Sequence, residues 1–139
     1  MVISHDHADD LAALAPFLRT NEQLTVWLPY SASAATKGIV LRSGARLRQE
    51  MDEVEVCQNV YLTGEMAGSA ANEQALILDT SDGLVVVVGC AHPGIVKGLG
   101  VGKRSVTHCT GGLAIGLSQE AFASDYEPAG TGRIMAVSR

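Results

Sequence analysis

The sequence predicts an α/β domain, a mixed sheet with flanking helices, and three features of the chain lead to this expectation. The apolar run from Leu84 to Val88 lies between turn residues and is typical of a buried strand. Leu11, Leu14 and Leu18 recur at helical spacing just after a short apolar run at the amino terminus. The order of apolar strand, polar turn and helix then recurs further along the chain, as expected of α/β proteins.

Length and composition fit one globular domain over residues 1–139. A chain of this size buries roughly two-thirds of its unfolded surface, enough for a sizeable core. The content of 47% hydrophobic and 18% charged residues excludes a disordered chain. A net charge of −5 without a basic patch argues against a nucleic-acid partner. Because no run approaches the about 20 apolar residues that cross a bilayer, no membrane partner is expected.

Cysteine usage predicts a reduced, cytoplasmic protein. The chain has three cysteines, an odd number at wide spacings, which does not suit a disulfide framework. Cys57 is expected to be an ordinary buried thiol, whereas Cys90 and Cys109 lie next to or near histidines. The amino terminus lacks the basic and apolar regions of a secretory signal.

In the first part of the chain, the pattern predicts a helix over about Asp10 to Arg19, in which Pro16 removes a backbone donor and kinks or shortens the helix. A strand is expected from Leu24 to Leu28, and a loop or a weak helix start from Ser31 to Thr36. The arginines that follow either bind an anionic substrate or form a solvated face; they are Arg42, Arg46 and Arg48.

The rest of the chain alternates strands and turns. The Asp-Gly step in Thr80 to Gly83 favours a tight hairpin between two buried strands. Proline early in a first turn suits a helix beginning at Pro93. The expected elements are strands at Glu53–Val56 (an edge strand), Val60–Leu62, Gln74–Asp79, Leu84–Val88 and Arg133–Val137, a small-residue loop at Gly64–Ala71, and helices at Pro93–Leu99 and Leu113–Phe122.

The most reactive stretch is the opening turn, Ser4-His5-Asp6-His7-Ala8-Asp9-Asp10. Imidazole nitrogens and carboxylate oxygens are the usual ligands of zinc, iron and manganese, and a tight turn can direct several of them at one point. The alternative is that Asp9 or Asp10 only caps the helix that follows, with solvated histidines beside it.

All four histidines are expected at junctions between a strand and a turn; they are His5, His7, His92 and His108. A single histidine at such a place is usually structural and bonded to backbone. The recurrence at every histidine is better explained by one shared metal centre.

The opening turn resembles the His-x-His-x-Asp-His signature of the metallo-β-lactamase superfamily. Within that superfamily, residues 72–76, 89–95 and 108–111 resemble the branch of 7,8-dihydropterin-6-yl-methyl-4-(β-D-ribofuranosyl)aminobenzene 5′-phosphate synthase-like hydrolases. The most specific match is Gly89-Cys90-Ala91-His92-Pro93-Gly94-Ile95, which joins a histidine loop to the preceding hairpin.

The resemblance implies an αββα sandwich and a metal-dependent hydrolase that acts on a phosphate- or ester-type bond of a small-molecule substrate. By implication His5, His7 and His92 hold one metal, and Asp9 and His108 contribute to a second. The ion is expected to be zinc, with manganese or iron as alternatives, and one or two ions are implied. The nucleophile would be a metal-bound hydroxide, with Asp9 or Asp10 as base or ligand.

Two departures from the signature change these expectations. Asp10 stands where the signature ends in histidine, which trades a nitrogen ligand for a harder oxygen and disfavours zinc. No carboxylate lies between His92 and His108 to bridge two metals, so about one transition metal per chain is expected.

The chain also begins just before the opening turn, so most of the first βα half of the family fold is expected to be absent. The strands Met1–Ser4 and Leu84–Val88 would then lack sheet neighbours. A homo-oligomer, or a partner that supplies the missing half, is therefore expected.

A competing interpretation is a non-catalytic remnant that binds a structural metal, or none. Its ligands would be Cys90, His92, His108 and Cys109. A closed set of two thiolates and two imidazoles leaves no open coordination position for a substrate or water.

Overall fold

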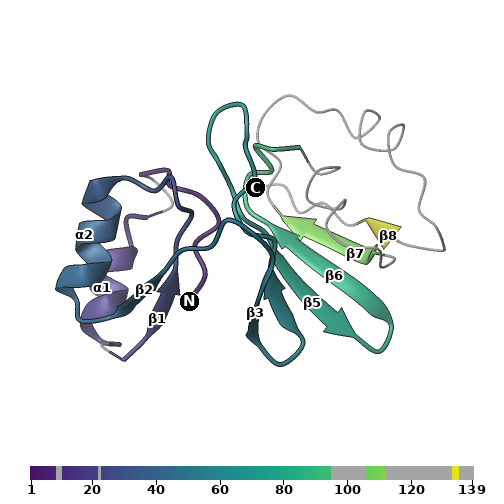
Figure 1. The fold of residues 1–139 in the computed structure, drawn as a ribbon, viewed down its shortest axis with the longest axis horizontal. Helices are drawn as coiled ribbons and strands as arrows, with labels where there is room; N and C mark the ends of the chain where they lie inside the picture. The colour runs from purple at the N-terminus through teal and green to yellow at the C-terminus, as the bar shows by residue number, and fades with distance from the viewer. Residues whose placement is uncertain (9–10, 22, 95–105, 112–132, 135–139) are drawn as a thin grey trace.

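Two sheets and a pair of helices make up the part of the chain that the computed structural model describes, which is residues 1–8, 11–21, 23–94, 106–111 and 133–134, the last two ranges by their backbone. Figure 1 shows the helices on the outer side of a two-stranded sheet, with a six-stranded sheet on its other side. The purple amino-terminal segment runs between the two sheets in the same view. A mixed α/β fold is therefore confirmed.

The smaller sheet and the helices share one aliphatic core. Strands β1 (Thr25–Trp27) and β2 (Arg46–Arg48) pair in parallel, and helices α1 (Leu14–Arg19) and α2 (Ala34–Arg42) cover them. Leucine, valine and alanine side chains fill the space between, as expected of a chain with only 4% aromatic residues. The buried members of this core are Leu11, Leu14, Leu18, Val26, Leu28, Ala32, Val40 and Ala45.

The larger sheet runs in the order β3-β4-β5-β6-β7-β8. Neighbours are antiparallel from β3 to β6 and parallel from β6 to β8. Its strands are β3 (Val54–Cys57), β4 (Val60–Leu62), β5 (Leu76–Thr80), β6 (Gly83–Val88), β7 (Val106–Gly111) and β8 (Arg133–Ile134). Alternate side chains of β6 are buried, so one face of this strand packs into the core.

Most expected elements lie close to their predicted positions, but the first helix begins later. Residues 11–13 form a turn, and the helix starts at Leu14. Pro16 therefore lies in the first turn, where a backbone N–H has no partner within the helix in any case. The weak helix start at Ser31–Thr36 becomes α2, because the Ser33 hydroxyl caps it by accepting the Thr36 N–H at 3.2 Å.

Three expectations need correction. Cys57 is exposed rather than buried, because it lies at the end of β3, the edge strand. Strand β6 has hydrogen-bonded neighbours on both sides, and the Met1–Ser4 segment pairs with β1 through a bridge between Val2 and Trp27. The expected lack of neighbours is therefore wrong for both segments. The homo-oligomer, which was inferred from it, stays a prediction.

The remaining expectations concern three arginines, membrane-spanning helices and two helices in the second half of the chain. Arg42, Arg46 and Arg48 are exposed, in agreement with a solvated face. No helix among the described residues is long and apolar enough to cross a membrane. The helix expected at Leu113–Phe122, and that at Pro93–Leu99 beyond residue 94, lie outside the described residues.

One glutamine joins the two sheets. Gln74 is only 1% exposed, and its backbone N–H donates to the Ser4 carbonyl at 2.8 Å. Its side-chain amide donates to the carbonyls of Ile3 at 2.8 Å and Trp27 at 3.2 Å. Because Gln74 immediately precedes Ala75 and β5, these bonds fix the amino-terminal segment and β1 against the larger sheet.

Replacing Gln74 by methionine keeps its volume and removes the donor, so Gln74→Met should lower the free energy of unfolding by about 1–3 kcal/mol. The reason is that the carbonyl of half-buried Ile3 loses its side-chain donor. Denaturant unfolding measures the effect, and Gln23→Met at an exposed position is the matched control. Equal stability of the two variants would show that this amide does not hold the sheets together.

Candidate metal centre

The side chains of the first two histidines, His5 and His7, project from the same side of the amino-terminal segment. His5 is buried, at 3% exposed, and His7 is half-buried. The Ser4 hydroxyl and Nδ1 of His5 lie 2.9 Å apart in a hydrogen bond. With the proton on Nδ1, this bond leaves the Nε2 lone pair for a metal and fixes the plane of the ring.

Asp6, between the two histidines, anchors the turn to α2. Its carboxylate accepts the Ser33 N–H at 2.6 Å and the Thr36 hydroxyl at 2.7 Å. Burial opposes ionisation of Asp6, but the hydrogen bonds from Ser33 and Thr36 and the nearby His7 outweigh it, so the pKa lies below its ordinary 3.8. The start of α2 therefore fixes the middle of the turn, while the His5 and His7 rings lie together in the cluster with His92.

The third histidine comes from the loop after β6, and a buried glutamate fixes that loop. Glu73 is 1% exposed, and its two carboxylate oxygens accept the Gly89 N–H at 2.7 Å and the His92 N–H at 2.9 Å. A Cβ on Gly89 would lie 2.7 Å from the Glu73 carboxylate and closer still to the Ser4 hydroxyl. Glycine is thus required where the loop leaves the strand.

Ala91, inside the same loop, has a φ of 58°. A non-glycine residue in this left-handed region costs roughly 1–2 kcal/mol. The turn that follows is closed by a bond from the Gly94 N–H to the Ala91 carbonyl at 2.9 Å. The strain is retained because the Glu73 bonds fix the backbone on either side of Ala91.

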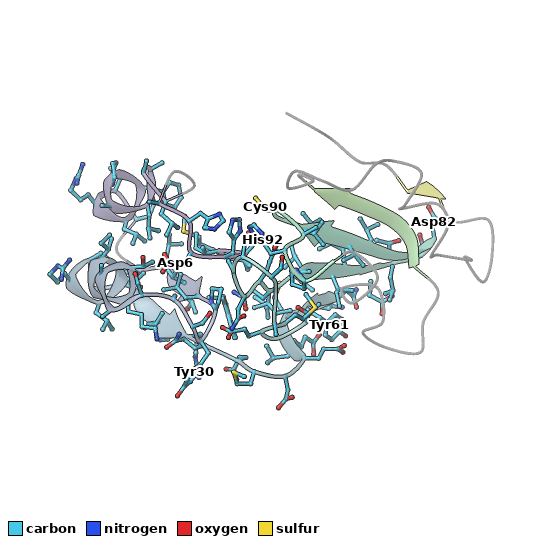
Figure 2. All side chains as sticks on the ribbon, turned by 90° about the horizontal axis from the view of Figure 1, so that it is seen from above. Asp6, Tyr30, Tyr61, Asp82, Cys90 and His92 are labelled. Carbon is cyan, nitrogen blue, oxygen red and sulfur yellow. The ribbon has the colours of Figure 1, made fainter. Side chains whose placement is uncertain are left out.

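Four side chains from these two segments converge. One ligand atom from each of His5, His7, Cys90 and His92 can be chosen so that all four lie within 4.8 Å of one another. The ring centroids of His5, His7 and His92 are 4.6–4.9 Å apart. Figure 2 shows Cys90 and His92 between the helices and the larger sheet, with Asp6 toward the helices.

The chemistry of this cluster fits a transition metal. Imidazole nitrogen and thiolate sulfur are the ligands that zinc prefers. In a tetrahedral zinc site with bonds of about 2.0–2.3 Å, ligand atoms lie roughly 3.3–3.7 Å apart. The cluster, spread over at most 4.8 Å, must therefore contract by about 1 Å, which small side-chain rotations supply.

The structure brings together three of the expected ligands, and with them Cys90, which the competing set shares with His92. His5, His7 and His92 form the cluster, and Cys90 joins them. Asp9 and Asp10 lie outside the described residues. His108 was expected at a strand end, and this was wrong, because it is the third residue of β7 and pairs with Val85 and Arg133. The side chains of His108 and Cys109 lie outside the description.

Sequence reasoning did not single out the residues that support the cluster. Glu73 and Gln74 form a polar pair directly before an apolar strand, which is an unusual place for two buried polar side chains. The position of Glu73 directly before that strand was the sign in the sequence that its side chain could have a structural role. The role of Ser4 had no signal in the sequence beyond its place next to His5.

No family model and no curated protein matches this chain. A solved structure does: Tm1679, a metal-dependent hydrolase of the β-lactamase superfamily, is similar over 99% of this chain and 75% of its own. The TM-score is 0.60 at 19% sequence identity. The likeness is one of fold, and the chain has a metallo-β-lactamase-like fold in its described part.

The lowered pKa of Asp6 predicts an acid-dependent loss of stability in the metal-free protein. A carboxylate whose folded pKa lies below its unfolded value of about 3.8 stabilises the fold above that pH, and the stabilisation is lost as the pH falls through the folded pKa. Asp6→Asn should therefore be less stable than wild type near about pH 6 and nearly equal to it in strong acid. Urea unfolding across this range tests it, with exposed Asp52→Asn as control. A constant difference at every pH would contradict the assignment.

Glu73→Gln should weaken zinc binding by about 10- to 100-fold, the usual effect of removing an outer partner of a metal site. An amide can accept only one of the two N–H bonds, so the Gly89–Gly94 loop should also lose amide protection in hydrogen exchange. Chelator competition and hydrogen exchange are the measurements. Glu55→Gln is the matched control, because Glu55 is exposed and its carboxylate accepts the Asn59 N–H at 3.4 Å, between β3 and β4 and away from the loop. Unchanged zinc affinity in Glu73→Gln would show that the loop does not need this carboxylate.

Proposed function

We propose that the protein is a metal-dependent hydrolase that cleaves a phosphate- or ester-type bond of a small molecule. The observation that carries the proposal is the convergence of His5, His7 and His92, which come from two segments far apart in the sequence. The fold shared with a metal-dependent hydrolase supports it. A bound zinc, or manganese or iron in its place, supplies Lewis acidity and a water molecule of lowered pKa.

The residues of the chain have separate tasks in this proposal. His5, His7 and His92 hold the metal, and the Ser4 hydroxyl orients the His5 ring. The Glu73 carboxylate keeps the His92 backbone in place through the bond at 2.9 Å. A base or an additional ligand is proposed to come from Asp9 or Asp10, and His108 is proposed to contribute to a second metal.

A second candidate function is a structural metal site, and the position of Cys90 favours it. Three imidazoles and one thiolate complete a tetrahedral zinc sphere and leave no open position. Metal content does not distinguish the two candidate functions, because both require a bound metal. Turnover of a substrate is the property that only the hydrolase has.

Protein purified without added metal should contain about one transition metal per chain by elemental analysis, because the described cluster has four ligands for one ion. His92→Ala should lower the occupancy after dialysis by about tenfold or more, and so should His5→Ala. The control is Tyr30→Ala, which removes a ring that is 60% exposed. Unchanged occupancy in both histidine variants would rule out this site.

The same preparations test the reaction with chromogenic phosphodiesters and esters. The hydrolase predicts turnover that follows the metal content across wild type, His92→Ala and Tyr30→Ala. Full metal occupancy without turnover of any of these substrates, both in wild type and in Cys90→Ala, which lacks the fourth donor, would favour the structural site.

A further inference from the structure

We propose that Cys90 is the fourth ligand of the metal and that its thiolate acts as a latch, closing the coordination sphere until it is withdrawn. This inference rests on the proposed function, because a latch matters only for a centre that turns over a substrate. The carrying observation is that Cys90 lies within 4.8 Å of all three histidine ligand atoms.

The backbone around Cys90 is fixed on both sides. The Gly89 N–H, one residue before it, and the His92 N–H, two residues after it, are both bound by the buried Glu73 carboxylate at 2.7 and 2.9 Å. Between these points Ala91 has its left-handed φ of 58°. The thiol is therefore carried by a loop of defined shape, and its withdrawal requires only rotation about the Cα–Cβ bond of Cys90, without movement of the loop.

The donor set determines what this thiol does when metal is present. Three imidazoles are neutral ligands, so they leave the full charge of a divalent ion uncompensated. Sulfur is a softer donor than water, and the half-buried Cys90 stands within reach of the fourth position. Cys90 should therefore outcompete water for the fourth position, and the set should prefer zinc to manganese.

Ligation by Cys90 has a direct cost for hydrolysis. A zinc centre that activates water has three protein ligands and one open position, whereas four protein ligands make a closed centre. The anionic sulfur also weakens the ion as a Lewis acid. Withdrawal of Cys90 would leave His5, His7 and His92, which is the three-ligand arrangement that hydrolysis needs.

The alternative is an ordinary thiol that packs against the imidazole rings without binding the ion. The two cases differ in whether sulfur bonds to the metal, and cobalt(II) reports this directly. A thiolate ligand gives cobalt a sulfur-to-metal charge-transfer band in the near ultraviolet, and imidazole or water ligands do not.

The test is titration of the metal-free protein with cobalt(II), followed by absorption. Wild type should show the sulfur band at about one cobalt per chain, and the band should be lost in Cys90→Ala. It should remain in Cys57→Ala and in Cys109→Ala, which control for the other two thiols. A wild-type complex without a sulfur band, or a band lost only in Cys109→Ala, would overturn the proposal.

A second measurement covers the case in which Cys90→Ala does not fold. In wild type, zinc should protect Cys90 from alkylation by iodoacetamide at least about tenfold, because a metal-bound thiolate is a poor nucleophile. Exposed Cys57 should react alike with and without zinc and serves as an internal control. Equal alkylation of Cys90 in both states would also overturn the proposal.

Turnover distinguishes a failure of the latch from a failure of the proposed function. Zinc-loaded Cys90→Ala should hydrolyse chromogenic phosphodiesters or esters about tenfold faster than wild type, although it binds zinc about 10- to 100-fold more weakly. Loss of the sulfur band without any turnover would keep Cys90 as a ligand and reject the hydrolase. Turnover in wild type that Cys90→Ala does not raise would keep the hydrolase and reject the latch.

Discussion

The close approach of Ser4 to Gly89 is the constraint on which the candidate metal centre depends. Ser4 carries His5 at the end of the amino-terminal segment, and Gly89 begins the loop that carries Cys90 and His92. A side chain on Gly89 would collide with Ser4 and with the Glu73 carboxylate. The two segments that carry the histidine and cysteine cluster can therefore meet only because this one position lacks a Cβ.

Two consecutive buried polar residues turn that contact into a defined geometry. Glu73 binds the loop after β6, while Gln74 binds the Ser4 and Ile3 carbonyls and reaches β1. A buried carboxylate and amide are costly unless hydrogen-bonded, so their bonds are specific as well as stabilising. On the other side of the turn, Asp6 binds the start of α2. The histidines are thus held between the smaller α/β layer and the larger sheet.

The cluster combines features of a catalytic and of a structural metal site. Its three histidines offer the donors that an open centre needs, and Cys90 offers the fourth donor of a closed one. Both descriptions hold for one centre if the thiolate is a removable ligand. The strained φ of Ala91 next to Cys90 is consistent with a loop whose shape is held for function, since such strain tends to occur at functional sites.

The sequence by itself determined the local elements and the chemistry of the opening turn. The alternation in β6, the helical spacing around Leu14 and Leu18, and the dense ligands of the His-x-His turn are short-range patterns, so they could be predicted. The convergence of His92 on His5 and His7 could only be suspected, because no spacing rule relates residues so far apart. Tertiary structure also decided that Cys90 joins them, that β6 has neighbours on both sides, and that His108 lies within a strand. Those outcomes depend on which strands pair and on a glycine that admits a close contact, and both are properties of the packed chain rather than of any single segment.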